Sequence, residues 1–255
     1  PRPVLFASRC YRMLLYTLPE GEERVRVLEK ARRDFPRLPE FHAEYAEHLA
    51  RELRFAEATE AMQEAFRAYA EHEEDGEAMD FDEAMLRLAT ERCSLWQKIA
   101  AREKTLTISA CTIARDEARD LPRWLQNTAV YSDERIVVDT GSKDDTKTLA
   151  EAAGARVFDY AWHDDFAAAK NAALARAKGE WVAFLDADEY FAVPQSVRPY
   201  LAALSVETPA IEAVMLTIAN LDEDDRFKEI QRFPAVRLFR RRADIAFVGR
   251  IHEAI

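Results

Sequence analysis

The pattern of hydrophobic and polar residues along the chain changes near residue 104. Residues 20–102 contain few β-prone residues and much Ala, Glu, Arg and Leu, a composition that favours helices. After residue 104, short apolar runs and helix-like segments alternate four times. This alternation is typical of α/β domains with a doubly wound, mostly parallel sheet. We therefore expect an all-α region over residues 1–103 and an α/β domain over residues 104–255.

The α/β part is expected to contain four short strands separated by helices. The strands are predicted at Thr105–Ile113, Glu134–Asp139, Ala155–Tyr160 and Trp181–Leu185. Helices are predicted toward Leu125 and Thr128, over Lys147–Ala153 and over Asp165–Lys178, the last two ending at Gly154 and Gly179. Further along the chain, a polar loop between strands is predicted at Leu221–Glu229 and a short strand at Ile245–Val248.

The strand at Trp181–Leu185 leads into an acidic segment, in which Asp186 and Asp188 lie two residues apart and Glu189 follows directly. Ligands of open α/β sheets bind beyond the carboxyl ends of the strands, so both aspartates should face a site. Two carboxylates this close repel each other unless a cation neutralises them. Oxygen ligands without Cys or clustered His favour Mg²⁺ or Mn²⁺ with a phosphate over zinc. The alternative interpretation is a strand-end turn with solvated acids.

Five blocks of the chain resemble, in the same order, the inverting nucleotide-sugar-dependent glycosyltransferases of family 2, which have the GT-A fold. The blocks are Ile113–Glu117, Val137–Thr146, Asp165–Asn171, Leu185–Glu189, and Arg237–Arg240 through Gly249–Glu253. The resemblance covers residues 104–255 and implies a GT-A domain there. It is strongest to the branch with peptide S-glycosyltransferases and tetratricopeptide-repeat-containing enzymes. More chain usually follows the last block in this family, so the domain is expected to be truncated at its C-terminus.

The resemblance implies transfer of a sugar from a nucleotide-sugar donor, a UDP-sugar, to an unidentified protein, peptide or glycan acceptor, with inversion. Asp139 is then expected to accept the uracil N–H or ribose hydroxyls, Asp186 to lie beside the ribose, and Lys170 to contact the base or diphosphate. The alternative for Lys170 is a solvated position on an Ala-rich helix. The residues expected to bind the nucleotide are Thr112, Ala114, Arg115, Glu117, Asp139, Lys170, Asp186 and Ala187.

The same resemblance implies a divalent cofactor, Mn²⁺ or Mg²⁺, held by Asp188. His252 is expected to complete the metal or diphosphate site, and a structural role is the alternative for this lone histidine. Inversion in one displacement requires a base that takes the proton of the acceptor. Glu253 is the first candidate for this catalytic base and Glu189 the second. The usual base of the family lies in an acidic pair further downstream, for which Glu223–Asp224 is a match by sequence only.

One turn departs from the family pattern. Asp145 stands where the family usually has Gly. We expect Asp144 and Asp145 to be turn or N-cap acids that hold the helix after them. A direct catalytic role for these two acids is therefore not expected.

Composition and charge limit the remaining function classes. The 255-residue chain has a net charge of −11, which argues against general binding to nucleic acid or anionic membranes. Cys10, Cys93 and Cys111 form no metal-binding spacing and no even disulfide framework, which favours a reducing compartment. No apolar run reaches membrane-spanning length, and no signal peptide is recognisable. We therefore expect a cytoplasmic protein with no nucleic-acid partner and no membrane span.

The helical region partly resembles tetratricopeptide repeats. Ala31 and Ala65 are separated by the 34-residue period of that repeat, but Leu53 stands where the repeat usually has Gly. One interpretation is a surface that binds an acceptor protein or a second copy of the chain, as in a homodimer. The other is a helical extension packed on the catalytic domain. The positions that fit one repeat are Ala46, Leu49, Phe55, Ala58, Met62 and Ala65.

A second part of the helical region is expected to differ from the repeat. Glu71–Asp75 is predicted to be a solvated acidic linker. The helix predicted over Phe81–Arg102 would then join the helical region to the α/β domain.

Three other function classes are weaker alternatives. Haloacid-dehalogenase phosphatases also end a buried strand in Asp-x-Asp, but they require Thr or Val where this chain has Tyr190. Nucleotidyltransferases of similar fold require a Gly-rich loop after the first strand, and residues 114–120 contain no Gly. The non-enzymatic alternative is a repeat-type adaptor with a degenerate transferase domain. The intact acids at positions 139, 186 and 188 argue against that adaptor.

Overall fold

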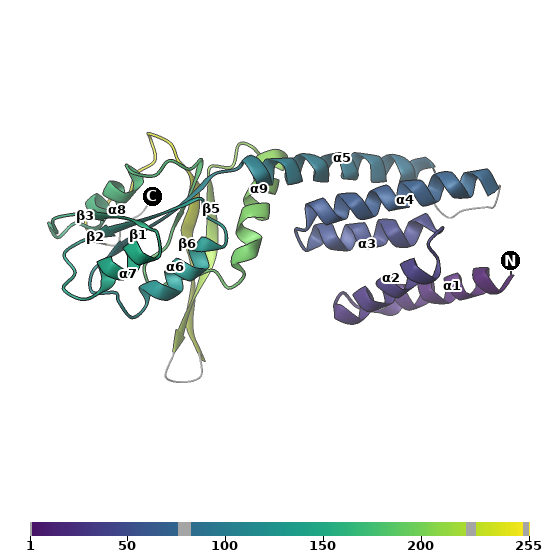
Figure 1. Ribbon diagram of the computed structural model, residues 1–255, viewed down its shortest axis with the longest axis horizontal. Helices are drawn as coiled ribbons and strands as arrows, with labels where there is room; N and C mark the ends of the chain where they lie inside the picture. The colour runs from purple at the N-terminus through teal and green to yellow at the C-terminus, as the bar shows by residue number, and fades with distance from the viewer. Residues whose placement is uncertain (1, 76–82, 223–227, 252–254) are drawn as a thin grey trace. The chain divides into compact units, whose positions relative to one another are not determined.

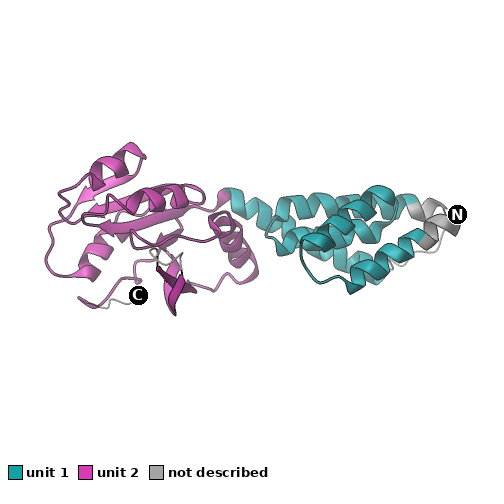
Figure 2. Ribbon diagram, turned by 90° about the horizontal axis from the view of Figure 1, so that it is seen from below, with its two compact units in different colours: residues 1–104 teal, residues 105–255 magenta. Residues whose placement is uncertain are grey.

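The chain divides into two compact units, residues 1–104 and residues 105–255 (Figure 2). The computed structural model describes residues 2–75, 83–222, 228–251 and 255. The first unit is helical, and the second is built on a sheet with helices around it (Figure 1). The predicted class is therefore confirmed: an α/β fold with a mixed, largely parallel sheet, preceded by an all-α region.

The helical unit buries the apolar positions that the repeat pattern singles out. Its described helices are α1 (Arg2–Thr17), α2 (Glu22–Asp34), α3 (Pro39–Arg51), α4 (Phe55–Asp75) and α5 (Glu83–Thr105), the last of which ends in the second unit. Helices α3 and α4 pack against each other. Ala46, Leu49, Ala58, Met62 and Ala65 are all buried. The linker predicted at Glu71–Asp75 is wrong, because these residues continue α4.

The turn between α3 and α4 contains a strained residue. Leu53 has a φ of 59°, in the left-handed region that favours glycine. This is the position where the repeat usually has Gly. The turn therefore keeps the backbone conformation that a glycine would adopt there, although the residue is a leucine.

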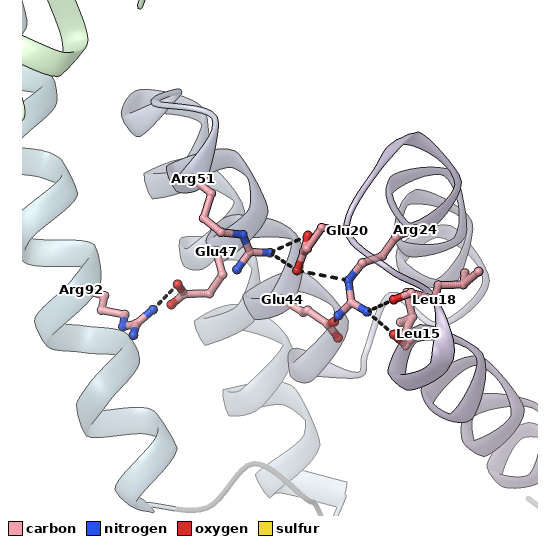
Figure 3. A network of polar contacts seen from close by, with 8 residues as sticks. All are labelled: Leu15, Leu18, Glu20, Arg24, Glu44, Glu47, Arg51 and Arg92. Atoms are coloured by element: carbon pink, nitrogen blue, oxygen red, sulfur yellow. Dashed lines mark hydrogen bonds and ion pairs between the residues drawn. The ribbon is translucent and has the colours of Figure 1, made fainter. Parts of the chain in front are cut away.

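A polar network connects α1, α2 and α3 in the helical unit (Figure 3). Arg24 of α2 donates to the carbonyl oxygen of Leu15 and pairs with Glu44 of α3. Arg51 of α3 reaches Glu20 at 3.3 Å. Burial raises the pKa of Glu44, and the two nearby arginines only partly oppose this effect. The network therefore joins the three helices and partly buries the carboxylate of Glu44.

The second unit contains one six-stranded sheet with the order β3-β2-β1-β4-β6-β5. Strands β1, β2, β3 and β4 pair in parallel, whereas β6 runs antiparallel to both β4 and β5. The parallel part has all its carboxyl ends at one edge, which is where ligands of such sheets bind. The strands are β1 (Ile108–Ala114), β2 (Glu134–Asp139), β3 (Arg156–Asp159), β4 (Trp181–Phe184), β5 (Ala213–Asp222) and β6 (Lys228–Arg240).

Helices cover both faces of this sheet. Along β4, Trp181 and Ala183 join one hydrophobic cluster, whereas Val182 and Phe184 join another. Alternate side chains of a strand point to opposite faces, so the two clusters lie on opposite sides of the sheet. Helices α6 and α9 contribute to the first cluster and α8 to the second. The helices of this unit are α6 (Leu121–Ala129), α7 (Thr146–Ala152), α8 (Phe166–Leu174), the short 3₁₀ helix η1 (Pro194–Ser196) and α9 (Val197–Glu207).

Several predicted elements differ from the structure. At the ends of the polar loop expected over Leu221–Glu229, β5 continues to Asp222 and β6 begins at Lys228. The helix expected over Asp165–Lys178 ends at Leu174, and Gly179 does not cap it. A Cβ at Gly179 would lie 2.5 Å from the backbone nitrogen of Ser109, so the glycine is needed for a close approach to β1. The strand expected at Ile245–Val248 is reduced to an isolated bridge at Val248.

Candidate functional site

The predicted site residues gather at the carboxyl edge of the parallel strands. Asp139 is the last residue of β2, and the acidic segment from Asp186 follows β4 directly. The loop that contains Arg115 and Glu117 follows β1, which lies between β2 and β4. The sheet order therefore brings three of the sequence blocks to the same edge.

Asp139 is a buried carboxylate, and one of its two oxygens has no hydrogen-bond partner among the described residues. The residue is only 2% exposed. The oxygen Oδ1 accepts the backbone N–H groups of Gly141 and Ser142, both at 3.0 Å. Gly141 has a φ of 106°, and this conformation turns the chain so that both N–H groups point back at the carboxylate. The other oxygen, Oδ2, is buried without a hydrogen-bond partner among the described residues. Such an orphaned acceptor is costly unless a ligand supplies the donor.

The loops after β1 and β2 are joined by side-chain-to-backbone hydrogen bonds. The N–H of Asp116 donates to Oγ of Ser142 at 2.9 Å, and the N–H of Glu117 donates to Oγ1 of Thr146 at 2.8 Å. Asp144 accepts the N–H groups of both Ala118 and Thr146 at 3.0 Å. Asp144 therefore anchors the turn and the start of α7. The side chain of Asp145, which occupies the N-cap position, makes no cap hydrogen bond.

The four residues predicted to surround the nucleobase divide into two pairs. Thr112 and Ala114 are buried in β1, and the hydroxyl of Thr112 donates to the carbonyl oxygen of Ile113 at 3.1 Å. Arg115 is exposed and Glu117 is half-buried in the loop that follows. Desolvation raises the pKa of Glu117, and the neighbouring carboxylate of Asp188 raises it further. The loop residues therefore present side chains at the edge, whereas the two strand residues offer only their backbone to a ligand.

Lys170 is enclosed and paired with the first aspartate of the Asp-x-Asp segment. Its side chain is 6% exposed, and its ammonium lies 3.0 Å from Oδ1 of Asp186. The rings of Phe184 and Phe247 pack edge to face beside the ammonium, each with its centroid 5.5 Å from it. Cation–π contacts of this kind stabilise a desolvated ammonium. The alternative prediction for Lys170, a solvated helix face, is therefore wrong.

The remaining members of the acidic segment differ in their partners. Both carboxylate oxygens of Glu189 accept hydrogen bonds from Arg237 of β6. Ala187 is buried. Asp188 is exposed and makes no hydrogen bond or ion pair with another residue that the structure describes. Arg237 belongs to the last sequence block, but its pairing with Glu189 was not predicted.

Several predicted residues lie outside the described part of the chain. These are His252 and Glu253, predicted for metal binding and catalysis, and the acidic pair Glu223–Asp224. Within the described ranges, no group of three or more His, Cys, Asp or Glu side chains is arranged to hold a metal ion. Among the described residues, Asp188 is thus the one residue to which the metal prediction applies.

The segment before residue 252 is held against α8. The side-chain amide of Asn171 donates to the carbonyl oxygen of Phe247 at 2.9 Å and accepts the N–H of Phe247 at 2.8 Å. The N–H of Phe166 donates to the carbonyl oxygen of Arg250 at 3.1 Å. The chain up to Arg250 therefore runs beside the helix that carries Lys170.

A cavity of about 490 Å³ lies between the C-terminal part of α8 and the segment after β6. It is lined by Asn171, Leu174, Ala175, Ala177, Val182, Phe239, Arg241, Arg242, Ala243, Ile245 and Ala246. None of the residues predicted to bind nucleotide or metal lines it. The candidate site is therefore defined by the strand ends and not by this cavity.

No described helix combines the length and the apolar character needed to cross a bilayer.

Comparison with known proteins gives a family match over the same part of the chain. The model of Glycosyl transferase family 2 matches residues 109–253. A TPR repeat-containing protein of Synechococcus elongatus is 39% identical over 148 residues, which are 58% of this chain and 35% of that protein. The SPbeta prophage-derived glycosyltransferase SunS of Bacillus subtilis is 25% identical over 164 residues, 63% of this chain and 38% of that protein. The chain thus spans little more than a third of the length of these curated relatives.

Solved structures overlap with this chain only in part. Glucosyl-3-phosphoglycerate synthase of Mycobacterium tuberculosis, crystallised with Mn²⁺, UDP and glucosyl-3-phosphoglycerate, is 26% identical with a TM-score of 0.38 and 46% coverage of each chain. Mannosyl-3-phosphoglycerate synthase of Rubrobacter xylanophilus is 25% identical with a TM-score of 0.39, covering 45% of this chain and 42% of that one. These overlaps are too partial to carry residue roles over to this chain.

Proposed function

The chain belongs to glycosyl transferase family 2 and is a glycosyltransferase, and we propose that its donor is a UDP-sugar. In this proposal the sugar is transferred to a protein, peptide or glycan acceptor. The transfer uses a divalent cation and inverts the anomeric centre. The observation that carries the choice of donor is the orphaned Oδ2 of Asp139 at the carboxyl edge of the sheet. Uracil offers one N–H donor and the ribose offers hydroxyl donors, and either would satisfy this buried acceptor.

Asp139 would recognise the nucleoside with little reorganisation. Two backbone N–H groups already fix the carboxylate, so Oδ2 has one position when the donor arrives. A buried acceptor that is held in place discriminates against ligands that lack the matching donor, because those ligands leave it unpaired. Arg115 and Glu117 would form the neighbouring wall of the base site from the loop after β1.

Lys170 would act on the ribose side through Asp186. The enclosed ammonium holds Oδ1 of Asp186 at 3.0 Å. Asp186 itself is 42% exposed in its side chain, so its other lone pairs remain accessible to ribose hydroxyls. We therefore propose that Asp186 contacts the ribose and that Lys170 orients Asp186 and balances its charge. Ala187, buried between the two aspartates, would contact the nucleotide only through its backbone.

The carboxylate of Asp188 suits a hard divalent cation. Mg²⁺ and Mn²⁺ in nucleotide sites are commonly held by one or two carboxylates, with phosphate oxygens and water completing the shell. An exposed carboxylate without a competing ion pair suits that requirement, and a complete protein cage is not needed. When bound, the ion would stabilise the negative charge that develops on the departing diphosphate. His252 is the further ligand that we propose from its position in the sequence.

The acceptor side needs a base that takes the proton of the attacking group. Glu253 is the proposed base, since it follows the segment that Asn171 and Phe166 hold against α8. A base opposite the leaving diphosphate would allow attack in one displacement and thus inversion. The proposed acceptor remains a class: a protein, a peptide or a glycan.

Nucleotide binding by calorimetry tests this proposal. UDP should bind more tightly in the presence of Mn²⁺ or Mg²⁺, and chelation of the cation should remove that gain. Asp188→Asn should abolish the dependence on the cation, because the substitution removes the charge that attracts it. Glu207→Gln, which changes an exposed carboxylate at the end of α9, is the control and should behave like the native chain. Binding of UDP that is equally strong with and without the cation in the native chain would contradict the metal role.

A further inference from the structure

Arg237 and Glu189 form a two-pronged ion pair beside the Asp-x-Asp segment. Nε of Arg237 donates to Oε2 of Glu189, and Nη2 donates to Oε1, both at 2.7 Å. The two side chains are each 17% exposed. A planar bidentate pair fixes the orientation of both partners as well as their charge. Strand β6 thus holds the end of the acidic segment through a contact that depends on geometry.

Glu189 in turn closes the segment on itself. Its Oε2 accepts the N–H of Asp186 at 3.1 Å, and its own N–H donates to the carbonyl oxygen of Asp186 at 3.0 Å. Residues 186–189 therefore form a turn that is pinned by one backbone hydrogen bond and one side chain. Asp188 is inside this turn, so the turn sets the direction in which its side chain leaves the backbone.

Asp188 differs from Asp186 and Glu189 in its charged neighbours. Lys170 lies 3.0 Å and Arg237 3.5 Å from the carboxylate of Asp186, and Arg237 also pairs with Glu189. Two cations thus balance two carboxylates. Asp188 is exposed and has no ion pair with another residue in the described ranges. Lys170 and Arg237 therefore pair with Asp186 and Glu189, and the carboxylate of Asp188 can attract a cation.

We propose that Arg237 and Glu189 are a positioning pair that holds the turn at residues 186–189 so that Asp188 can bind the divalent cation. This inference rests on the proposed function, since it concerns the same site. It assigns Glu189 a role different from the catalytic base considered from the sequence. Both of its oxygens already accept hydrogen bonds from the guanidinium, which holds the carboxylate on Arg237. Neither residue needs to touch the cation or the sugar.

The affinity for Mn²⁺ in the presence of saturating UDP tests the pair, with free Mn²⁺ measured by electron paramagnetic resonance. Arg237→Met and Glu189→Gln should each weaken Mn²⁺ binding by about tenfold to a hundredfold, as loss of an outer-shell partner does. The double variant should lose no more than the worse single variant, because the two residues act as a unit. Arg237→Lys keeps the charge but loses the fork, so it should recover only part of the affinity. UDP binding without the cation is measured alongside, because Arg237 and Glu189 also contact Asp186.

Arg242→Met is the matched control. Arg242 also forms a fork with a carboxylate, Asp244, at 2.9 and 2.8 Å, but this pair is exposed and Arg242 donates to Asp244 and Glu212, not to the turn. Its loss should leave Mn²⁺ affinity unchanged. Melting temperatures of all variants separate positioning from unfolding, and Arg237→Lys serves if Arg237→Met does not fold.

The outcomes that would overturn the inference are distinct. Unchanged Mn²⁺ affinity in Arg237→Met and Glu189→Gln, with cation-dependent UDP binding in the native chain, overturns the positioning role alone. Loss of donor hydrolysis in Glu189→Gln with Mn²⁺ affinity retained would identify Glu189 as a chemical participant and also overturn it. Absence of cation-dependent UDP binding in the native chain would overturn the proposed function and this inference together.

Discussion

At the scale of single residues, Asp139 offers the sharpest test of nucleotide recognition. Asp139→Asn keeps an oxygen for the N–H groups of Gly141 and Ser142 but replaces Oδ2 with an amide donor. A donor would then face the N–H or hydroxyl of the nucleotide, and this mismatch should cost about 1–3 kcal/mol of binding. We expect UDP affinity to fall by about tenfold to a hundredfold, measured by calorimetry.

The control for this prediction is the acid at the end of the neighbouring strand. Asp159→Asn removes one charge from the same edge, where Asp159 is exposed and pairs with Lys147. Its UDP affinity should match that of the native chain. An equal loss in both variants would mean that the net charge of the edge, and not the orphaned oxygen of Asp139, determines affinity.

Residue-level chemistry could be predicted from the sequence where it depended on local pattern. Asp139, Asp186 and Asp188 were placed at strand ends because an apolar run that stops on an acid is visible in the sequence. The pairing of Glu189 with Arg237 was not predicted, since it depends on β6 returning antiparallel to β4. The basic run at Arg237 was the one signal, but its partner is 48 positions earlier in the chain.

At the scale of elements, the accuracy of each prediction depended on how sharply the sequence delimits the element. Strand β2 has the predicted bounds, because a buried run ending on Asp is sharply delimited. Helix α8 was extended to Lys178 because its Ala-rich composition favours helix throughout, whereas the structure ends it at Leu174. Gly179 looked like a helix cap but is required for the approach of the chain to Ser109. The sequence alone does not distinguish a glycine needed for tertiary packing from a glycine that ends a helix.

The turn between α3 and α4 leads to a prediction about stability. Leu53 has a positive φ, which costs an L residue with a Cβ about 1–2 kcal/mol and costs glycine nothing. Leu53→Ala and Leu53→Gly both remove the side chain, so packing losses largely cancel between them. We expect Leu53→Gly to be more stable than Leu53→Ala by about 1 kcal/mol, measured by urea unfolding. The usual order in helices is the reverse, and finding that order here would contradict the strained turn.

At the scale of the whole molecule, the candidate site belongs to one of the two units. Every contact described for the site joins residues between Thr112 and Arg250, all within residues 105–255. The GT-A part therefore has its own core, sheet and candidate site. The helical unit has its own buried cluster around Leu28 and Phe41. Its similarity to tetratricopeptide repeats makes it the proposed site for an acceptor protein or a second copy of the chain.

Deletion of residues 1–75 tests whether donor binding belongs to the sheet unit and partner binding to the helical unit. The deletion leaves α5 and the sheet unit, so UDP binding and slow donor hydrolysis should persist at the level of the full chain. If the helical unit recruits the acceptor or a second copy, transfer to the acceptor or dimerisation, measured by light scattering, should be lost. A soluble deletion variant that no longer binds UDP would contradict the independence of the site. A variant that becomes insoluble would instead favour the helical extension that packs on the catalytic domain, because removing such an extension exposes the apolar surface that it covers.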